Sequence, residues 1–264
     1  MGGMTHLLLL LWAGVTVGTV VDLQKRIIGG QDCLTNESRY HVQLRKSEAN
    51  GPFELECGGS LISPQWILTA AHCWDETWTM RTVLGVHPGP GTPVAVTPHF
   101  FMDNQNRKHD IMLLEITDPN IHHTTIIPLP NCQSRLNEGD EVQIAGHASK
   151  LKTFSKLRIS EETVKLQCAN TEVVNCQKLR NCLPNSYPDD WQYLSYQHWL
   201  CCQRAGVDLS KGDSGGGVVF NGMLYGVNSF IGNGTHACVE AAGFMDVCEK
   251  EYMDWILKTT GIKP

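Results

Sequence analysis

A serine on a turn of glycines is the first feature of this sequence that could do chemistry. Segment 212–217 reads GDSGGG, with Ser214 as its hydroxyl. A nucleophilic serine needs an exposed Oγ on a tight turn and backbone N–H groups aimed at the developing oxyanion. Glycines permit both, because they adopt strained φ values and let a substrate approach the backbone. Alone, the segment fits a plain glycine turn equally well, so partners must be sought elsewhere.

A histidine and an aspartate are candidate partners. Segment 69–73 reads TAAHC and contains His72. A neutral histidine can take a serine proton near neutral pH. Asp110 opens the apolar run IMLL at 111–114, which suits a buried carboxylate that holds one histidine tautomer. Taken singly, the histidine fits a structural role and the aspartate fits a surface position at the start of a strand. Together with the serine, in the order His, Asp, Ser, they indicate acyl-transfer chemistry.

Five sequence blocks together give a resemblance to a known family. They read RIIGG at 26–30, CGGSLI at 57–62, WILTAAHC at 66–73, DIMLL at 110–114 and GDSGG at 212–216. In this combination the chain resembles the chymotrypsin/trypsin family of serine peptidases, from Ile27 to about Thr260. The resemblance implies that His72 is base and then acid, Asp110 its orienter and Ser214 the acyl-forming nucleophile. The N–H groups of Gly212 and Ser214 would form the oxyanion hole.

The resemblance also explains a dibasic pair, Lys25 and Arg26, before Ile27. It implies a zymogen in which cleavage after Arg26 frees the ammonium group of Ile27. That group would then pair with Asp213, beside the nucleophile. A buried ion pair forms only when its geometry offsets the cost of desolvation, which makes it usable as a switch.

The fold class follows from many short β-like runs separated by turns. The runs lie at 41–44, 60–62, 66–69, 111–116, 141–144, 217–220 and 223–227, and this rhythm predicts an antiparallel β sandwich or barrel. Segment 187–199 is interpreted as a surface loop with aromatic anchors. An apolar face at 249–259, followed by Gly261, predicts a helix. The family resemblance implies an all-β fold of two antiparallel six-stranded β-barrels with the active site between them and this C-terminal α-helix.

Domain boundaries follow from these features. Residues 1–19 are expected to form a signal peptide, 20–26 an activation peptide and 27–264 the peptidase domain. The barrels would span about 27–135 and 136–248.

Substrate selection is predicted from a carboxylate six residues before the nucleophile. The resemblance places Asp208 at the base of the primary specificity pocket. A buried carboxylate there would attract Arg or Lys side chains, which predicts cleavage after these residues. Ser229 matches the family serine that supports the buried aspartate. Ile231 falls where a glycine usually opens the pocket mouth, and Gly243 is expected to keep the second open position.

The pocket also departs from the family pattern. Leu209 replaces a small polar neighbour of Asp208, and Ser210 stands where many members have a pocket-bracing cysteine. If Ile231 narrows the mouth, Asp208 lies out of a substrate's reach. A narrow or altered pocket therefore stays open as an alternative to Arg/Lys specificity.

The chain has 11 cysteines without paired metal-ligand spacing, which favours a disulfide framework in an oxidising compartment. The resemblance implies the bridges Cys33–Cys168, Cys57–Cys73, Cys132–Cys248 and Cys182–Cys201. Cys202 could replace Cys201, and Cys176 could replace Cys182. Since the count is odd, at least one thiol is free or pairs with another chain.

The N-terminal residues predict export. An apolar run at 7–17, of about eleven residues, is short for a membrane span and is typical of a signal peptide. Sequons at Asn36 and Asn233 agree with a secreted, extracellular glycoprotein. Storage in secretory granules is compatible with this route. After signal removal we expect no membrane association.

A net charge of −6 argues against a dedicated nucleic-acid binder. The expected partners are protein or peptide substrates, an activating protease and serine protease inhibitors. We predict no cofactor and no metal, since the short stretch between His72 and Asp110 lacks the family's calcium-binding loop. The alternatives are a catalytically weak homologue that acts by binding a partner, and an extracellular structural or carbohydrate-binding β protein.

Overall fold

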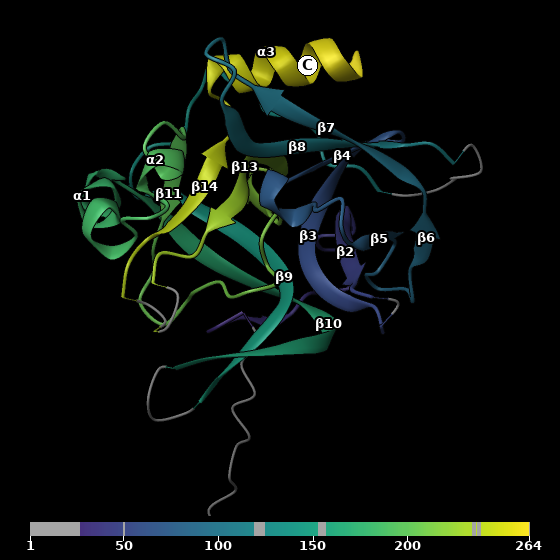
Figure 1. The fold of residues 1–264 in the computed structure, drawn as a ribbon. Helices are drawn as coiled ribbons and strands as arrows, with labels where there is room; N and C mark the ends of the chain where they lie inside the picture. Colours follow the sequence, from purple (N-terminus) through teal and green to yellow (C-terminus); the bar gives the residue numbers. More distant parts are fainter. Residues whose placement is uncertain are drawn as a thin grey trace, which may run out of the picture.

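The computed structural model describes residues 27–49, 51–118, 125–152, 157–233, 236 and 239–263. The predicted signal peptide and activation peptide, Arg26 included, lie outside this part of the chain. Figure 1 shows two β-sheets side by side, with a C-terminal helix lying across one end of the molecule. Every ladder in both sheets is antiparallel.

The N-terminal sheet has seven strands in the order β6-β5-β2-β3-β4-β8-β7. They are β2 (His41–Ser47), β3 (Glu54–Ser63), β4 (Trp66–Thr69), β5 (Thr79–Leu84), β6 (Thr92–Val94), β7 (Val96–Met102) and β8 (Lys108–Ile116). Its two outer strands do not pair with each other in the residues that the structure describes. This half is therefore a curled, open sheet rather than the closed six-stranded barrel predicted for it.

The C-terminal sheet closes on itself. Its strands are β1 (Gln31–Asp32), β9 (Glu141–Lys152), β10 (Leu157–Val174), β11 (Trp199–Cys202), β12 (Gly217–Phe220), β13 (Met223–Phe230) and β14 (Ala242–Asp246). Because β10 pairs with both β9 and β11, the strands from β9 to β14 form a closed ring, and β1 is added at its outer edge. The all-β class, the two-sheet arrangement and this barrel are confirmed.

The core lies between the two sheets and under the C-terminal helix. Ile111, Met112, Leu113 and Leu114 of β8 are all 0% exposed, so both faces of this strand are covered. An apolar run without alternation is typical of a strand buried on both sides. Burial of each such side chain contributes about 1.5–3 kcal/mol. Asp110, which directly precedes this run within β8, is thereby held by a buried strand.

Helices cover the ends of the sheets. Helix α3 (Lys250–Thr260) ends at Gly261, whose φ of 69° is left-handed, and the Gly261 N–H donates to Leu257 O. It begins one residue later and ends one residue later than predicted. Tyr252 and Ile256 on its inner face are fully buried. Among the described residues, no helix combines the length and the apolar character that a membrane crossing requires.

The segment predicted as an aromatic surface loop differs from that expectation. Helix α1 (Gln177–Ser186) precedes it, and α2 (Trp191–Leu194) lies within it. Leu194 and Gln197 are buried, so the segment contributes to the interior as well as to the surface.

Candidate active site

His72 lies in a short 3₁₀ turn, η1 (Ala71–Cys73), directly after β4. Ala71 and Cys73 are fully buried and fix the turn, and the Cys57–Cys73 disulfide ties it to β3. The His72 side chain is 40% exposed, so one edge of the ring faces solvent. The sulfur atoms of Cys57 and Cys73 lie near this ring, but they are bonded to each other and offer no thiolate to a metal ion.

Asp110 meets His72 through two hydrogen bonds. Its Oδ1 accepts the His72 backbone N–H at 2.8 Å, and its Oδ2 accepts from His72 Nδ1 at 2.8 Å. Ser229 Oγ, on β13, also donates to Oδ2. An ionised carboxylate can only accept, so the Nδ1 of His72 carries the proton. The other ring nitrogen, Nε2, is then left as the proton acceptor.

The pKa of His72 is raised above its ordinary value. Partial burial alone would lower it, but the charge of Asp110 and the hydrogen bond to it outweigh burial. The negative charge of Glu56 adds to this increase, while Lys108 opposes it. An imidazolium is thus stabilised where a transferred proton would rest.

The turn with Ser214 is fastened to the N-terminal sheet. Ser214 O accepts the Gly58 N–H at 2.7 Å, and the Gly215 N–H donates to Asn228 O at 2.7 Å. Gly215 has a φ of 79°, and a Cβ there would lie 2.2 Å from Thr69 Oγ1. Only glycine fits this contact, which holds the turn against the segment that leads to His72.

Two backbone N–H groups of this turn, those of Gly212 and Ser214, are the ones predicted to form an oxyanion hole. Gly212 has a φ of 95°, outside the range that other residues prefer. Within the described part of the chain, the N–H groups of Gly212 and Ser214 do not donate to any protein acceptor. They are thus available to a developing oxyanion.

Both members of the predicted activation pair are buried in the C-terminal barrel. Asp213 is 0% exposed, and its Oδ2 accepts the Ser210 N–H at 2.9 Å. Ile27 is also 0% exposed and packs in an apolar cluster with Leu209. The Ile28 carbonyl accepts the Asp208 N–H at 3.0 Å, which joins the start of the domain to the pocket segment. The ion pair between Ile27 and Asp213 stays a prediction.

The segment around Asp208, which is predicted to form the base of the specificity pocket, has a buried carboxylate next to apolar residues. Asp208 is 6% exposed, and its Oδ1 accepts the N–H of Leu209 at 2.8 Å. Ile231 packs against the apolar cluster that contains Leu209 and Ala242. The large side chain expected to narrow the pocket therefore lies on the same side as Leu209.

Gly243 does not take the position predicted for it. A Cβ on Gly243 would meet the Trp199 ring at 3.0 Å and Leu179 at 3.4 Å, away from the cluster with Leu209. The preceding residue, Ala242, faces that cluster instead. Neighbouring residues of a strand point to opposite faces, so an error of one position reverses the assignment.

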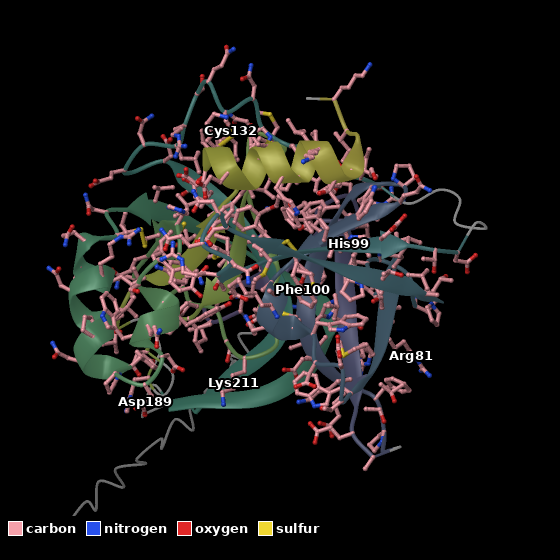
Figure 2. All side chains as sticks on the ribbon, turned by 45° about the horizontal axis from the view of Figure 1, so that its top comes forward. Arg81, His99, Phe100, Cys132, Asp189 and Lys211 are labelled. Carbon is pink, nitrogen blue, oxygen red and sulfur yellow. A yellow bond between two sulfur atoms is a disulfide. The ribbon has the colours of Figure 1, made fainter. Side chains whose placement is uncertain are left out.

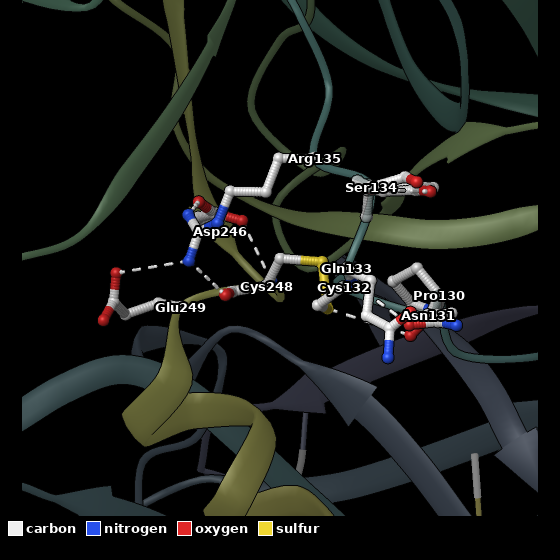
Figure 3. The surroundings of a disulfide bond; sticks show 10 residues. Pro130, Asn131, Cys132, Gln133, Ser134, Arg135, Asp246, Cys248 and Glu249 are labelled. Atoms are coloured by element: carbon white, nitrogen blue, oxygen red, sulfur yellow. Dashed lines mark hydrogen bonds and ion pairs between the residues drawn. A yellow bond between two sulfur atoms is a disulfide. The ribbon is translucent and has the colours of Figure 1, made fainter.

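Four disulfides join cysteines in the described part of the chain. Cys33–Cys168, Cys57–Cys73 and Cys132–Cys248 have the predicted partners. Figure 3 shows the last of these beside Arg135, which donates to Asp246 at 2.9 Å. The predicted bridge Cys182–Cys201 is wrong, because Cys201 pairs with Cys176.

Two cysteines of the described chain keep free thiols, Cys182 and Cys202. Burial raises the pKa of the Cys202 thiol to about 12. Cys238 lies outside the described residues.

The remaining predicted sites lie at the surface. Asn36 is exposed and Asn233 is half-buried. Lys211, which the sequence places two residues before Asp213, is exposed, as Figure 2 shows.

Comparisons with known proteins agree with this geometry. The family model Trypsin matches residues 27–256. Kallikrein-8 of Homo sapiens is 26% identical, over 98% of this chain and 96% of its own length. Trypsin I-P1 of Gallus gallus is 28% identical, over 97% and 98% of the two chains. Snake venom serine protease KN13 of Trimeresurus stejnegeri is 30% identical, over 87% and 85%.

Solved structures also match. Neuropsin, a serine protease of mouse brain, superposes with a TM-score of 0.67 at 25% identity, covering 88% of this chain and 98% of its own. Human heparin binding protein superposes with a TM-score of 0.65 at 22% identity, covering 90% and 98%, and this second match shows the fold alone.

Proposed function

Because the chain belongs to the trypsin family of serine endopeptidases, we propose that it hydrolyses peptide bonds through an acyl-enzyme formed on Ser214. The observation that carries the proposal is the hydrogen-bonded group of His72, Asp110 and Ser229. It lies beside the turn with Ser214, in which only glycine fits at position 215. The alternative of a protein that only binds a partner leaves this arrangement of proton acceptor and orienter without a role.

In the proposed reaction, His72 Nε2 takes the proton of Ser214 Oγ as that oxygen bonds to the substrate carbonyl carbon. The carbonyl oxygen becomes an oxyanion and accepts hydrogen bonds from the N–H groups of Gly212 and Ser214. Asp110 stabilises the imidazolium through Nδ1 without taking its proton. When the peptide C–N bond breaks, His72 gives the proton to the leaving amine. Water then repeats the sequence to release the acid and restore Ser214.

We further propose that the enzyme is made as a zymogen and activated by cleavage after Arg26. The burial of Ile27 and Asp213 in the same barrel supports a pairing of the new ammonium group with this carboxylate. The partners that this implies are an activating protease, protein or peptide substrates, and serine protease inhibitors.

For substrate choice, the proposal is a preference for Arg or Lys at P1, based on the buried carboxylate of Asp208. Ile231 packs against the apolar cluster that contains Leu209 and Ala242, and we propose that this packing narrows the approach to the carboxylate. We also propose secretion, with glycans at Asn36 and Asn233 and storage in secretory granules. The four disulfides of the described residues support the secretory route, because disulfides persist in oxidising compartments.

A serine-directed fluorophosphonate tests the reaction. After cleavage at Arg26, we expect labelling of Ser214 in the wild type and none in Ser214→Ala, which folds with the same turn. An Arg26→Gln variant, which resists the activating cut, is the control for the zymogen step. No labelling of correctly processed wild type contradicts the enzyme proposal. A positional peptide library then tests P1, and an unchanged profile in Asp208→Ser contradicts the Arg/Lys preference.

A further inference from the structure

The backbone N–H of Asp110 lies at a break in both ladders of β8. The pairing with β4 begins at Thr69↔Met112, two residues further along the strand. The pairing with β7 has a bulge between Phe100↔Met112 and Met102↔Lys108, which passes over Asp110. Neither neighbouring strand therefore offers Asp110 a register partner. A buried N–H without an acceptor is costly, so this position needs one from elsewhere.

Gln197 supplies that acceptor from the other half of the molecule. Its Oε1 accepts the Asp110 N–H at 3.0 Å, although the two residues are 87 positions apart. Its Nε2 donates to the Tyr193 carbonyl at 3.0 Å, back into α2. The oxygen faces a donor and the nitrogen faces an acceptor, so the amide has one orientation only. Gln197 is 1% exposed, so its amide is shielded from solvent.

The surrounding segment, residues 191–198, contacts the same strand at neighbouring positions. Tyr196 Oη donates to the Lys108 carbonyl at 2.9 Å, and its ring meets His109 edge-on at 5.0 Å. Burial and then the negative charge of Asp110 raise the pKa of Tyr193, whose phenol therefore lies close to the carboxylate. Residues of one short segment thus hold the strand just before Asp110 and at Asp110 itself.

We infer that Gln197 is a positioning residue that holds the main chain of Asp110, and through it the carboxylate, against His72. The inference rests on the proposed function of Ser214, because Asp110 orients a catalytic base only in a peptidase. The three groups that donate hydrogen bonds to the Asp110 carboxylate fix its rotation. The position of the Asp110 Cα, however, depends on the backbone. A carboxylate that moves away stabilises the imidazolium less, and misplacement by about 1 Å can cost as much as 10²-fold in rate.

The test is Gln197→Leu in the full chain, activated after Arg26, with Gln192→Leu as matched control. Gln192 lies exposed on α2, in the same segment as Gln197, so the control makes the same substitution without touching Asp110. With active sites counted by fluorophosphonate titration, we expect about a 10-fold lower kcat at unchanged KM in Gln197→Leu. NMR of the His72 ring should show its pKa lowered toward the ordinary value. Gln192→Leu should change neither.

The positioning role would be overturned by equal effects in the two variants, by a higher KM with an unchanged kcat, or by an unchanged pKa of His72. If Gln197→Leu does not fold, hydrogen exchange in the wild type decides. The Asp110 amide should be strongly protected although no strand pairs with it, and exchange as fast as in exposed turns would overturn the inference. If the wild type lacks peptidase activity, the proposed function fails, while the His72 pKa and the Asp110 exchange rate still test the contact with Gln197.

Discussion

Around Asp110, four hydrogen bonds come from three separate parts of the chain, whereas beside Asp208 the next residue, Leu209, packs in a cluster of apolar side chains. The first arrangement depends on particular donors and acceptors, so few substitutions preserve it. The second depends on volume, so many substitutions preserve the fold while they change what fits. This difference explains why the catalytic centre is recognisable from short motifs and the specificity pocket is not.

The largest expected effect comes from changing the carboxylate itself. Asp110→Asn presents an NH₂ group to His72 Nδ1 and favours the wrong tautomer, so kcat should fall about 10⁴-fold. The raised pKa of His72 means that activity rises with pH as the ring loses its proton. Without the charge of Asp110, this acid limb of kcat/KM should move to lower pH.

Steady-state kinetics with titrated active sites measures both quantities. Asp254→Asn, which changes an exposed carboxylate on α3, is the control and should leave rate and pH profile unchanged. A small loss of kcat in Asp110→Asn would mean that the hydrogen bonds around this carboxylate do not control the rate.

The second largest expected effect concerns the disulfide between Cys176 and Cys201. Cys176 and Cys201 are separated by 25 positions, and a loop of this size gives a stabilisation of about 3 kcal/mol. In a Cys182→Ser background, which prevents exchange of partners, Cys176→Ser should lower the free energy of unfolding by about this amount. The Cys182→Ser change alone should cost less than about 0.5 kcal/mol. Urea unfolding measures both, and the reverse order would restore Cys182 as the partner of Cys201.

A third prediction concerns the narrow approach to Asp208. Ile231→Gly removes an apolar side chain that packs toward Leu209, so kcat/KM for Arg substrates should rise about 10-fold. Substrates with alanine at P1 should gain little, since they do not reach the carboxylate. Ile126→Gly, at an exposed position, is the control. An equal gain for both substrates would show that Ile231 does not limit access.

The smallest expected effect concerns His41, a buried histidine close to the turn that contains Ser214. His41 is buried, and a Cβ on Gly58 would lie 2.8 Å from its Cε1. Burial, followed by the charges of His147 and His87, lowers its pKa well below 6.5. As the pH drops below about 6.5, His41 therefore binds a proton in the unfolded chain but not in the folded chain. The free energy of unfolding falls over this pH range as a result.

His41→Gln should reduce this loss by about 1 kcal/mol between pH 6.5 and 5.5. The difference between variant and wild type isolates His41 from His72, whose raised pKa acts with the opposite sign. Urea unfolding at the two pH values measures it, with the exposed His236 changed to Gln as control. Parallel curves for wild type and His41→Gln would show that His41 is not the acid-sensitive group.

Much of the fold was predictable from local pattern. The seven predicted β-runs all fall within strands, because alternation and turn residues reflect local geometry. The long strand β10 was missed, since its polar residues do not alternate cleanly, and so were the helices of segment 177–194. Helix α1 contains Pro184 and lacks acidic residues in its first turn, so the ordinary helix signals are weak there.

The sequence by itself determined the family and the residues of the proposed reaction centre. Ser214, His72 and Asp110 lie in motifs whose small and apolar neighbours are required locally, for backbone approach and for burial. Tertiary structure alone decided which cysteine pairs with Cys201 and which residue of β14 faces Leu209. It also decided that Gln197 supports Asp110. These choices depend on strand register and on contacts between residues far apart in the chain, and a shift of one position, which hardly changes the sequence pattern, reverses them.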